Sequence, residues 1–574
     1  MKKITRFNIF SITLYVVFGV FLVRLLGFYA FDHKSALMTR DARLALSERE
    51  PAQRGEIRDR NGITIAGSKT GYMVRVKKGS DDAVSLTVKN LAKVTDATEE
   101  EILANMEKEN FSYYNPYIFD ESADARLITK IKETPDLFPS VEIKEVSVRE
   151  YFYPDLCAHL LGRCGKVTEE DLARGYNLTD LIGKQGAEKA FEEYLRGTDG
   201  KTAVVKSTSR GDVTFTEDIP QMCGKNVYLT IDINLQESAE NALKDVISKT
   251  YGATSGAVVI TDVNSGEILA LASYPSYNIE DFSKNYERLL KDKDKPLFNR
   301  ATAGLYEPGS TYKPITAIAS MEAGTLRHSE IINTKGKYEY YDRAFRCNIY
   351  RETGKTHGRI NVAQALGVSC NYFFYELGHR TGIDKIAETA HLFGLDSATG
   401  IELSQEEAVG KIAHPQNRSS HWYAGDTLQA AIGQSDNRFT PLALANYAAT
   451  LANGGTLYST HILKAVDEEK VTPTVKNKIS ISNETLNAIR QGMLYVTQKG
   501  TAKSVFSDFR VSVAGKTGTS QVSGKTNGLF IGYAPSDAPE IAFCAVVEGA
   551  PSGNTAAEVI RNAIPTHFNI QKGN

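Results

Sequence analysis

A serine and a lysine stand three residues apart in the stretch "EPGSTYKPI", as Ser310 and Lys313. Proline lacks a backbone N–H and fits only the first turn of a helix, so Pro314 predicts a helix start within about one turn and Ser310 at or beside the N-cap. Lys313 then lies one turn along on the same face. Burial and the helix N-terminus both disfavour an ammonium, so Lys313 can be the base that a serine nucleophile needs. The alternative is an N-cap serine beside a solvated lysine.

The tripeptide Lys-Thr-Gly occurs twice in the chain, at residues 69–71 and at residues 516–518. The first copy lies in the charged N-terminal half, and we expect a loop there. The second copy lies in the strand-like stretch "VAGKTGTSQV", where Lys516 could hold a substrate carboxylate. Gly518 would let an extended peptide approach the backbone, and Thr517 and Thr519 add hydroxyl groups.

A Ser-x-Asn element is the third part of the pattern, and the chain offers several copies of it. The stretch "GVSCNYFFYELG" opens directly into a helical pattern rich in aromatic residues, whereas the copy at Ser435 leads through Thr440-Pro441 into a helix that starts later. We therefore choose Ser369 and Asn371, also on the resemblance described below, and interpret Ser435 as structural. The candidates are Ser276–Asn278, Ser369–Asn371, Ser435–Asn437 and Ser552–Asn554.

The elements around these motifs predict the architecture of the second half of the chain. Strand patterns occur early, in "NVYLTID" and "GAVVITDVNSGEILALAS", and late, in "VSVAGKTGTSQV", "GLFIGYAP" and "EIAFCAVVEG". Helical patterns fill the middle, and "TAAEVIRNAI" is a closing helix. We expect an α/β (α+β) domain whose sheet is assembled from both ends, with helices packed on it.

The N-terminus differs from the rest of the chain. A basic arm precedes an apolar run from Phe7 to Val23, which resumes after Arg24 as "LLGFYAF". About 20 helical residues cross a bilayer core, so Phe7 to Phe31 predicts one membrane anchor if Arg24 snorkels to an interface. A cleaved signal peptide is the alternative, but no small-residue cleavage site follows cleanly. The basic arm favours a cytoplasmic N-terminus.

The remaining front half, residues 32–222, predicts a mixed α/β module without a catalytic constellation. Asn61-Gly62 lies between short alternating runs, which is a hairpin signal. A later stretch predicts an amphipathic helix that ends at Gly197. Its expected buried face consists of Ala187, Ala190, Phe191, Tyr194 and Leu195.

Composition narrows the classes of partner and cofactor. The formal net charge is -2, which gives no sign of a nucleic-acid partner. The six cysteines are thinly spread and show no CxxC spacing, HExxH is absent, and the ten histidines form no ligand pattern. We expect no metal and no cofactor.

The ordered set "EPGSTYKP", "GVSCNYFF" and "AGKTGTSQ" resembles the transpeptidase domain of class B penicillin-binding proteins. The front half is similar to that class too, through the anchor, "RGEIRDRNGITIA" and "GKQGAEKAFEEYLRGTDGK". The resemblance covers nearly the whole chain, and "SCNYFFYELG" leans toward the cell-elongation type. It implies an anchor at 1–31, an elongated dimerisation-like pedestal at 32–222, and a β-lactamase-like transpeptidase domain with an antiparallel sheet at 223–574.

This resemblance also implies roles for individual residues. Ser310 would attack the penultimate D-Ala carbonyl of a peptidoglycan stem peptide and release the terminal D-Ala, with Lys313 taking the serine proton. Ser369, with Lys516 behind it, would protonate the leaving amine, and Asn371 would bind a peptide carbonyl. Thr517, Gly518 and Thr519 would line the same groove, and the N–H groups of residues 310 and 519 would form the oxyanion hole. β-Lactams would acylate the serine.

The implied partners are lipid-linked glycan strands, the membrane, a polytopic glycan polymerase and a cell-wall synthesis complex. The catalytic domain would lie outside the cytoplasm. A membrane-anchored D,D-carboxypeptidase or a β-lactamase-type hydrolase would use the same three motifs, and the large front module favours the transferase. A β-lactam-sensing receptor would carry several membrane helices and a zinc protease motif, and a catalytically dead scaffold would not need the intact set of motifs.

Overall fold

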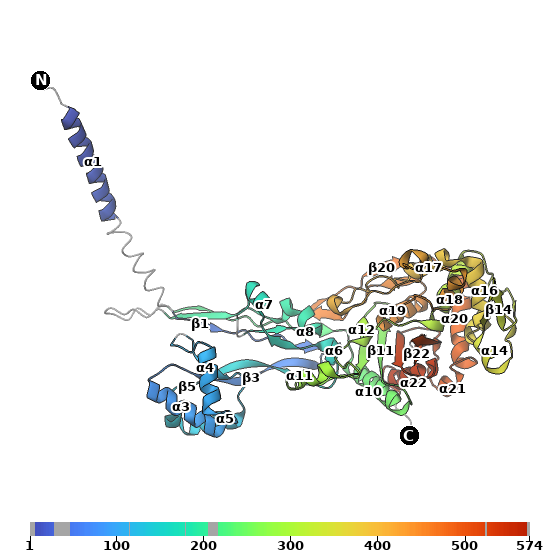
Figure 1. Cartoon of the computed structure of the whole chain (residues 1–574), viewed down its shortest axis with the longest axis horizontal. Coiled ribbons are helices and arrows are strands. Elements are labelled where there is room, and N and C mark those ends of the chain that lie inside the picture. Colours follow the sequence, from blue (N-terminus) through green and yellow to red (C-terminus); the bar gives the residue numbers. More distant parts are fainter. Residues whose placement is uncertain are drawn as a thin grey trace. The chain divides into compact units, whose positions relative to one another are not determined.

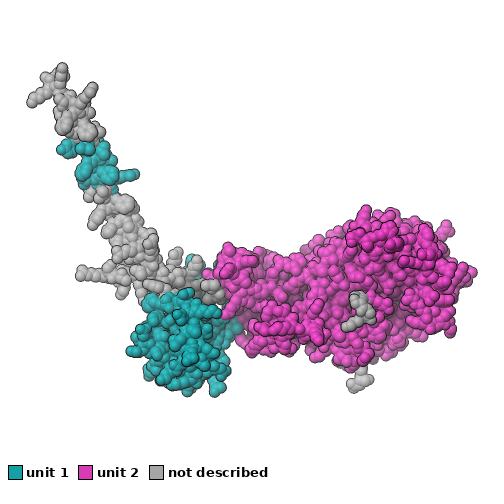
Figure 2. Space-filling view, viewed as in Figure 1, with its two compact units in different colours: residues 1–54, 70–148, 196–224 teal, residues 55–69, 149–195, 225–574 magenta. Residues whose placement is uncertain are grey.

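The computed structural model describes residues 6–27, 46–113, 115–177, 180–204, 216–522 and 525–570. The chain divides into two compact units, which Figure 2 colours separately. Unit 1 comprises residues 1–54, 70–148 and 196–224, and unit 2 comprises residues 55–69, 149–195 and 225–574. The structure therefore divides the chain differently from the linear scheme of 32–222 and 223–574. That linear scheme stays a proposal.

The N-terminal segment forms helix α1 (Arg6–Gly27). No helix among the described residues combines the length and the apolar character that crossing a membrane requires. The predicted anchor extends to Phe31, and residues 28–31 lie outside the described residues. The membrane anchor therefore stays a prediction.

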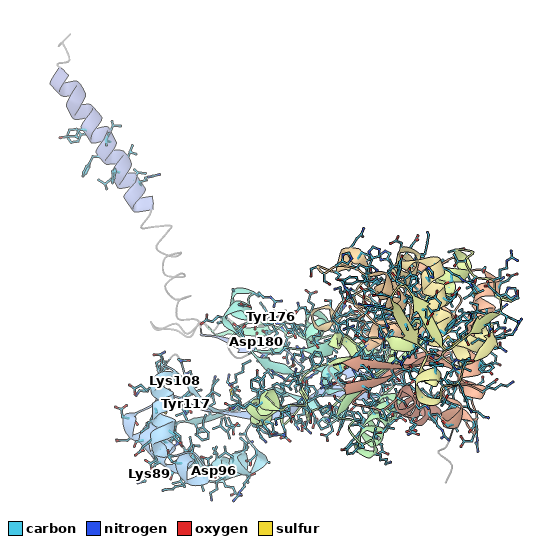
Figure 3. All side chains as sticks on the ribbon, turned by 45° about the vertical axis from the view of Figure 1, so that its right-hand side comes forward. Lys89, Asp96, Lys108, Tyr117, Tyr176 and Asp180 are labelled. Atoms are coloured by element: carbon cyan, nitrogen blue, oxygen red, sulfur yellow. The ribbon has the colours of Figure 1, made fainter. Side chains whose placement is uncertain are left out.

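Unit 1 contains a small α/β layer with its own hydrophobic core. Side chains such as Leu91, Ile102 and Ile128 meet in that core, and each is at most 5% exposed. Lys89, Lys108 and Tyr117, labelled in Figure 3, mark its helices α3 and α4 and its strand β4. The elements are α3 (Asp81–Val94), α4 (Glu99–Lys108), α5 (Ala125–Glu133), β4 (Tyr117–Asp120), parts of β3 (Thr64–Val76) and β5 (Val141–Tyr151), and the antiparallel sheet β1 (Leu46–Glu50), β8 (Gly200–Val204) and β9 (Thr216–Ile219).

Unit 2 is built on a five-stranded antiparallel sheet of order β12-β11-β23-β22-β21. Two of its strands come from before the helical middle of the chain and three from after it, which confirms the predicted assembly from both ends. Val258 pairs with Ala545 and Thr517 with Phe530 across the sheet. The strands are β11 (Ser255–Asp262), β12 (Ile268–Tyr274), β21 (Ala514–Val522), β22 (Lys525–Ala534) and β23 (Ile541–Glu548).

Both faces of this sheet are buried, because successive side chains of a strand point to opposite faces. Val258 and Ile260 join a core with helices α10 (Ile233–Lys249) and α22 (Gly553–Ala563). Ala257 and Val259 join the larger core on the other face. Helices that contribute to that larger core include α13 (Lys313–Glu322), α15 (Val362–Gly367), α16 (Asn371–Thr381), α17 (Ile383–Leu392), α18 (Ala424–Ala431), α19 (Pro441–Ala452) and α20 (Asn483–Gln498), of which Figure 1 labels α16 to α20.

Hydrogen bonds explain why residues 55–69 and 149–195 belong to unit 2. Strand β2 (Ile57–Arg58) pairs in parallel with β10 (Val227–Leu229). The Gly55 N–H donates to the Leu195 carbonyl at 2.8 Å. Arg149 forms a buried ion pair with Glu188 at 2.7 Å. These contacts join positions that are far apart in sequence.

The front half contains one confirmed prediction and two wrong ones. The Asn61-Gly62 hairpin is present, since β2 and β3 pair antiparallel around Gly62 at φ +89°. The Lys-Thr-Gly copy at 69–71 is not a loop, because it continues β3, which pairs with β5. The predicted amphipathic helix is two short helices, α8 (Gly186–Ala190) and α9 (Glu192–Leu195), and of the expected buried face Ala190 and Tyr194 are exposed.

The smaller elements of unit 2 complete the fold. They are α6 (Ala158–Leu161), α7 (Glu169–Ala173), α11 (Phe282–Lys291), α12 (Arg300–Ala303), α14 (Asn348–Thr353), α21 (Lys503–Phe506), β6 (Cys164–Lys166), β7 (Leu181–Gly183), β13 (Ile332–Thr334), β14 (Lys337–Tyr340), β15 (Arg343–Arg346), β16 (Gly358–Ile360), β17 (Thr456–Tyr458), β18 (Leu463–Val466), β19 (Glu469–Lys470) and β20 (Val475–Lys478).

Candidate active site

Ser310 lies in a short 3-10 turn, η3 (Gly309–Tyr312), which runs directly into α13. Pro314 is within the first two residues of α13, as its chemistry predicts, but the N-cap of α13 is Tyr312 and not Ser310. The Lys313 N–H donates to the Ser310 carbonyl. Side chains three residues apart eclipse each other in a 3-10 helix, so Ser310 and Lys313 still share one face.

Lys313 is completely buried, and its amine is held by the Ser-x-Asn element. Nζ donates to the Ser369 carbonyl at 2.8 Å and to Asn371 Oδ1 at 2.7 Å, and it lies 3.3 Å from Ser369 Oγ. Burial lowers the pKa of Lys313 to about 8. Within the described part of the chain, no hydrogen bond joins this amine to the Ser310 hydroxyl.

The backbone at the Ser-x-Asn element explains how two side chains reach Lys313. Helix α15 ends at Gly367, and Ser369 follows in the left-handed region at φ +55°. Cys370 then caps α16, whose first residue is Asn371. A positive φ at a serine is strained, and such strain concentrates at functional sites. This turn directs the Ser369 hydroxyl and the Asn371 amide to the same amine.

Lys516 reaches the same hydroxyl from the sheet. It lies on β21, is completely buried, and its Nζ donates to Ser369 Oγ at 2.9 Å and to the Thr517 carbonyl at 3.0 Å. Burial, and then the positive charge of Lys313, hold the pKa of Lys516 well below its usual value. Two buried amines therefore converge on Ser369 Oγ.

The remaining predicted residues follow Lys516 along β21. The Thr517 and Thr501 hydroxyls lie 2.7 Å apart. A Cβ at Gly518 would lie 2.6 Å from the Pro308 carbonyl, and one at Gly309 would lie 2.7 Å from the Thr519 carbonyl. The missing side chains thus let the serine turn pack closely on β21. Close packing alone therefore explains why residue 518 is a glycine, and no peptide ligand is needed for that explanation. The role of Gly518 in substrate binding stays a proposal.

The rejected Ser-x-Asn copies have structural surroundings. Asn437 is completely buried, accepts from the Ala413 N–H at 3.0 Å and donates to the Ala430 carbonyl at 3.2 Å. Asn278 donates to Asp155 at 2.9 Å, and Ser552 is the N-cap of α22. None of these side chains has a hydrogen bond to Lys313 or Lys516 within the described residues.

Sequence reasoning missed several neighbours of the site. Asn348 accepts from Asn371 Nδ2 at 3.3 Å. Cys347, His357 and Cys370 bring three possible ligand atoms within 4.8 Å of one another. Thiolate and imidazole are donors that Zn²⁺ takes, and a closed tetrahedral site needs a fourth. No CxxC or HExxH spacing could have shown this group, because folding brings its members together.

Two family models match long stretches of this chain. Residues 256–565 match the model described as "Penicillin binding protein transpeptidase domain", and residues 49–229 match "Penicillin-binding Protein dimerisation domain". The chain is 30% identical to "Peptidoglycan D,D-transpeptidase MrdA" of Acinetobacter baumannii over 546 residues, which cover 89% of this chain and 80% of that protein.

Two solved structures are similar over most of their length. A chain in the structure described as "Structural coordination of polymerization and crosslinking by a peptidoglycan synthase complex" is 26% identical to this chain. The TM-score is 0.76, and 99% of each chain is covered. The Helicobacter pylori complex between PBP2 and MreC contains a chain with a TM-score of 0.82 at 24% identity, covering 92% of this chain and 99% of that chain. The second likeness concerns the fold alone.

Proposed function

The chain belongs to the penicillin-binding protein family of serine transpeptidases and is a class B peptidoglycan D,D-transpeptidase, and from this premise we propose how its own residues carry the reaction. Ser310 Oγ attacks the penultimate D-Ala carbonyl of a stem peptide. The bond to the terminal D-Ala nitrogen breaks, and the serine ester forms. The amine of a neighbouring stem peptide then displaces the serine and forms the cross-link.

The observation that carries this proposal is the hydrogen bonding of Lys313. A neutral amine has two N–H groups and one lone pair. The Ser369 carbonyl and Asn371 Oδ1, at 2.8 and 2.7 Å, match the two N–H groups. Nζ also lies 3.3 Å from Ser369 Oγ, the longest of its three contacts, and a neutral amine that gives up this contact has a lone pair with which it can accept the serine proton.

Ser369 and Lys516 supply the route of the proton to the leaving group. Lys516 donates to Ser369 Oγ at 2.9 Å, which leaves the Ser369 O–H free to donate to another group. We propose that this hydroxyl passes its proton to the departing D-Ala nitrogen and regains one from the lysines. Both lysines are buried, so the proton is not exchanged with bulk water at each step.

Substrate contacts follow from the same geometry. Asn371 would bind a backbone carbonyl of the peptide, while Thr517 and Thr519 would bind its terminal carboxylate. The N–H groups of Ser310 and Thr519 would stabilise the oxyanion. Gly518 would leave room for the extended peptide.

Labelling with a fluorescent penicillin tests the nucleophile. β-Lactams would acylate Ser310 because they resemble the acyl donor, so Ser310→Ala should abolish the label. The thermal melt should stay nearly unchanged, since the side chain is small and half-buried. Labelling of the variant at full stoichiometry would overturn the assignment.

Transfer and hydrolysis need a separate measurement. A D,D-carboxypeptidase or β-lactamase would give the acyl group to water. Incubating the protein with lipid-linked glycan strands and a polymerase should yield cross-linked dimers. Release of D-Ala with no dimers would favour the hydrolase.

We also propose the setting of the enzyme. Residues 1–31 would anchor it in the cell membrane with a cytoplasmic N-terminus, residues 32–222 would form a pedestal, and residues 223–574 would lie outside. A polytopic glycan polymerase within a cell-wall synthesis complex would be the partner, and the peptidoglycan synthase complex that contains a 26%-identical chain supports this. The relatives named MrdA support a role in cell elongation.

A further inference from the structure

Residues 331–360, between the serine helix and the Ser-x-Asn element, carry a concentrated positive charge. They hold seven Lys or Arg and three Asp or Glu, a net charge of +4 against -2 for the whole chain. Lys337 pairs with Glu339 at 2.7 Å. The other six cations are exposed, and we call them the cationic rim: Lys335, Arg343, Arg346, Arg351, Lys355 and Arg359.

The cations of the rim are not paired with acidic side chains among the described residues. None of its six side chains makes an ion pair with a described residue, although Asp342 and Glu352 belong to the same segment. Like charges that gather without partners repel one another. An anionic ligand would remove that repulsion.

A hydrogen bond ties this segment to the active site. Asn348 Oδ1 accepts from Asn371 Nδ2 at 3.3 Å, and Asn371 also accepts from Lys313 at 2.7 Å. Arg346 stands two residues before Asn348. Helix α14, which begins at Asn348, and helix α16, which begins at Asn371, lie at the same end of unit 2 in Figure 1.

The two arginines nearest in sequence to this contact, Arg346 and Arg351, are both exposed. Arg351 is three residues after Asn348 and shares its helix face. Its charge acts on the Tyr375 hydroxyl, one turn after Asn371, and opposes the rise of that pKa to about 12 that burial causes. The Phe345 ring lies 5.5 Å from the Tyr375 ring, so strand β15, which ends at Arg346, packs on the same helix.

We propose that the cationic rim, with Arg346 and Arg351 at its centre, binds carboxylates of the stem peptide other than the terminal one. This inference rests on the proposed function, in which Asn371 holds the peptide backbone next to the rim. Guanidinium groups bind carboxylates through paired N–H groups, so arginine suits this ligand. Because the groups are exposed, salt should weaken the binding.

The test uses the full-length protein and a synthetic stem pentapeptide, with D-Ala release as the readout. The double variant Arg346→Gln/Arg351→Gln should raise KM about tenfold at low salt, with kcat changed less than about twofold, because it removes two exposed charge contacts. High salt should bring the wild type close to the variant. A matched pair on α10, Lys244→Gln/Lys249→Gln, should leave KM unchanged.

A second peptide, with its non-terminal carboxylates amidated, identifies the ligand. The wild type should show the raised KM with this peptide, and the double variant should show no further change. Equal KM values of the two proteins for the unmodified peptide would overturn the inference. So would competition by inorganic pyrophosphate without an effect of amidation, because the rim would then serve a lipid-linked phosphate.

Acylation by benzylpenicillin separates this inference from the proposed function. This small ligand has a single carboxylate, so the double variant should react within about twofold of the wild-type rate. A wild type that neither releases D-Ala nor acquires a penicillin at Ser310 would contradict the proposed function. An active wild type with an unaltered double variant would contradict the cationic rim alone.

Discussion

Two lysine amines meet at one serine hydroxyl, with Lys313 Nζ at 3.3 Å and Lys516 Nζ at 2.9 Å from Ser369 Oγ. Two ammonium groups this close in a buried site would repel strongly and would both lose hydration. At least one amine must therefore be neutral near physiological pH. The motifs supply the two lysines, and the burial of the lysine amines determines their protonation state.

The pH dependence of acylation should report this neutral amine. Burial lowers the pKa of Lys313 from its usual value to about 8, so the fraction of neutral base grows as pH rises through that value. The second-order rate of penicillin acylation should rise about tenfold per pH unit below the pKa and level off above it. Stopped-flow measurements from pH 6 to 9.5 would show this rising limb of the pH–rate profile. An acylation rate that does not change with pH would contradict a lysine base.

Lys313→Arg is the matched control for that profile. Arginine keeps the positive charge but cannot be deprotonated in a protein. The variant should react about 10²–10⁴-fold more slowly and lose the limb near pH 8. A variant that keeps the limb would assign it to another group, such as Lys516.

Ser369 and Ser435 offer a direct comparison between the two Ser-x-Asn copies. Ser369 Oγ contacts both lysines, whereas Ser435 Oγ accepts from Arg418 at 3.1 Å. Ser369→Ala should slow penicillin acylation about 10²-fold or more because it removes the proton route. The acylation rate of Ser435→Ala should stay within about threefold of the wild-type rate, since this substitution removes only a hydrogen bond outside the site. The reverse ranking would overturn the choice of motif.

At the scale of elements, the serine turn is held between a strand and a loop. Gly309, at φ +52°, donates its N–H to the Gly433 carbonyl at 2.9 Å. A Cβ at Gly309 would lie 2.7 Å from the Thr519 carbonyl of β21. The turn therefore keeps Ser310 at a fixed distance from the strand that carries Lys516.

Gly309→Ala should disturb catalysis more than stability alone explains. The strained φ costs about 1–2 kcal/mol of folding free energy, and the clash with Thr519 moves the turn. A displacement near 1 Å can cost about 10²-fold in rate, which penicillin acylation would measure. Gly324→Ala is the control, because Gly324 has φ +69° but nothing within 4 Å of its Cβ position. It should lower the melting temperature and leave acylation unchanged; equal losses of activity in both variants would contradict positioning by this contact.

Local chemistry made part of this site predictable from the sequence. Pro314 predicted the start of the helix, and the three motifs predicted which residues meet in the active site. The 3-10 turn at Ser310 and the left-handed Ser369 could not be predicted, because contacts with Gly433, Thr519 and α15 impose them. Asn348 was missed for the same reason, since its hydrogen bond to Asn371 forms only when the chain folds.

At the scale of the whole molecule, nonlocal pairing limited the prediction in the same way. Alternating apolar runs were enough to predict a sheet built from both ends of the second half. They did not show that residues 55–69 and 149–195 would join unit 2, because parallel pairing of β2 with β10 depends on positions about 170 residues apart. Each of the two units therefore combines segments that are not adjacent in sequence.

This division into units allows a sharp test of the front half. The Lys77 N–H donates to the Ser140 carbonyl at 2.7 Å, so residues 78–139 of unit 1 can be excised and Lys77 joined to Ser140 through two glycines. Because Ser310 and its surroundings have their own cores, penicillin acylation should stay within about twofold of the full chain. If the front half activates a glycan polymerase, as we propose, that activation should be lost in a reconstituted assay. The full-length variant Ser310→Ala should lose penicillin acylation and keep the activation of the polymerase. A protein without residues 78–139 that still activates the polymerase would contradict this role.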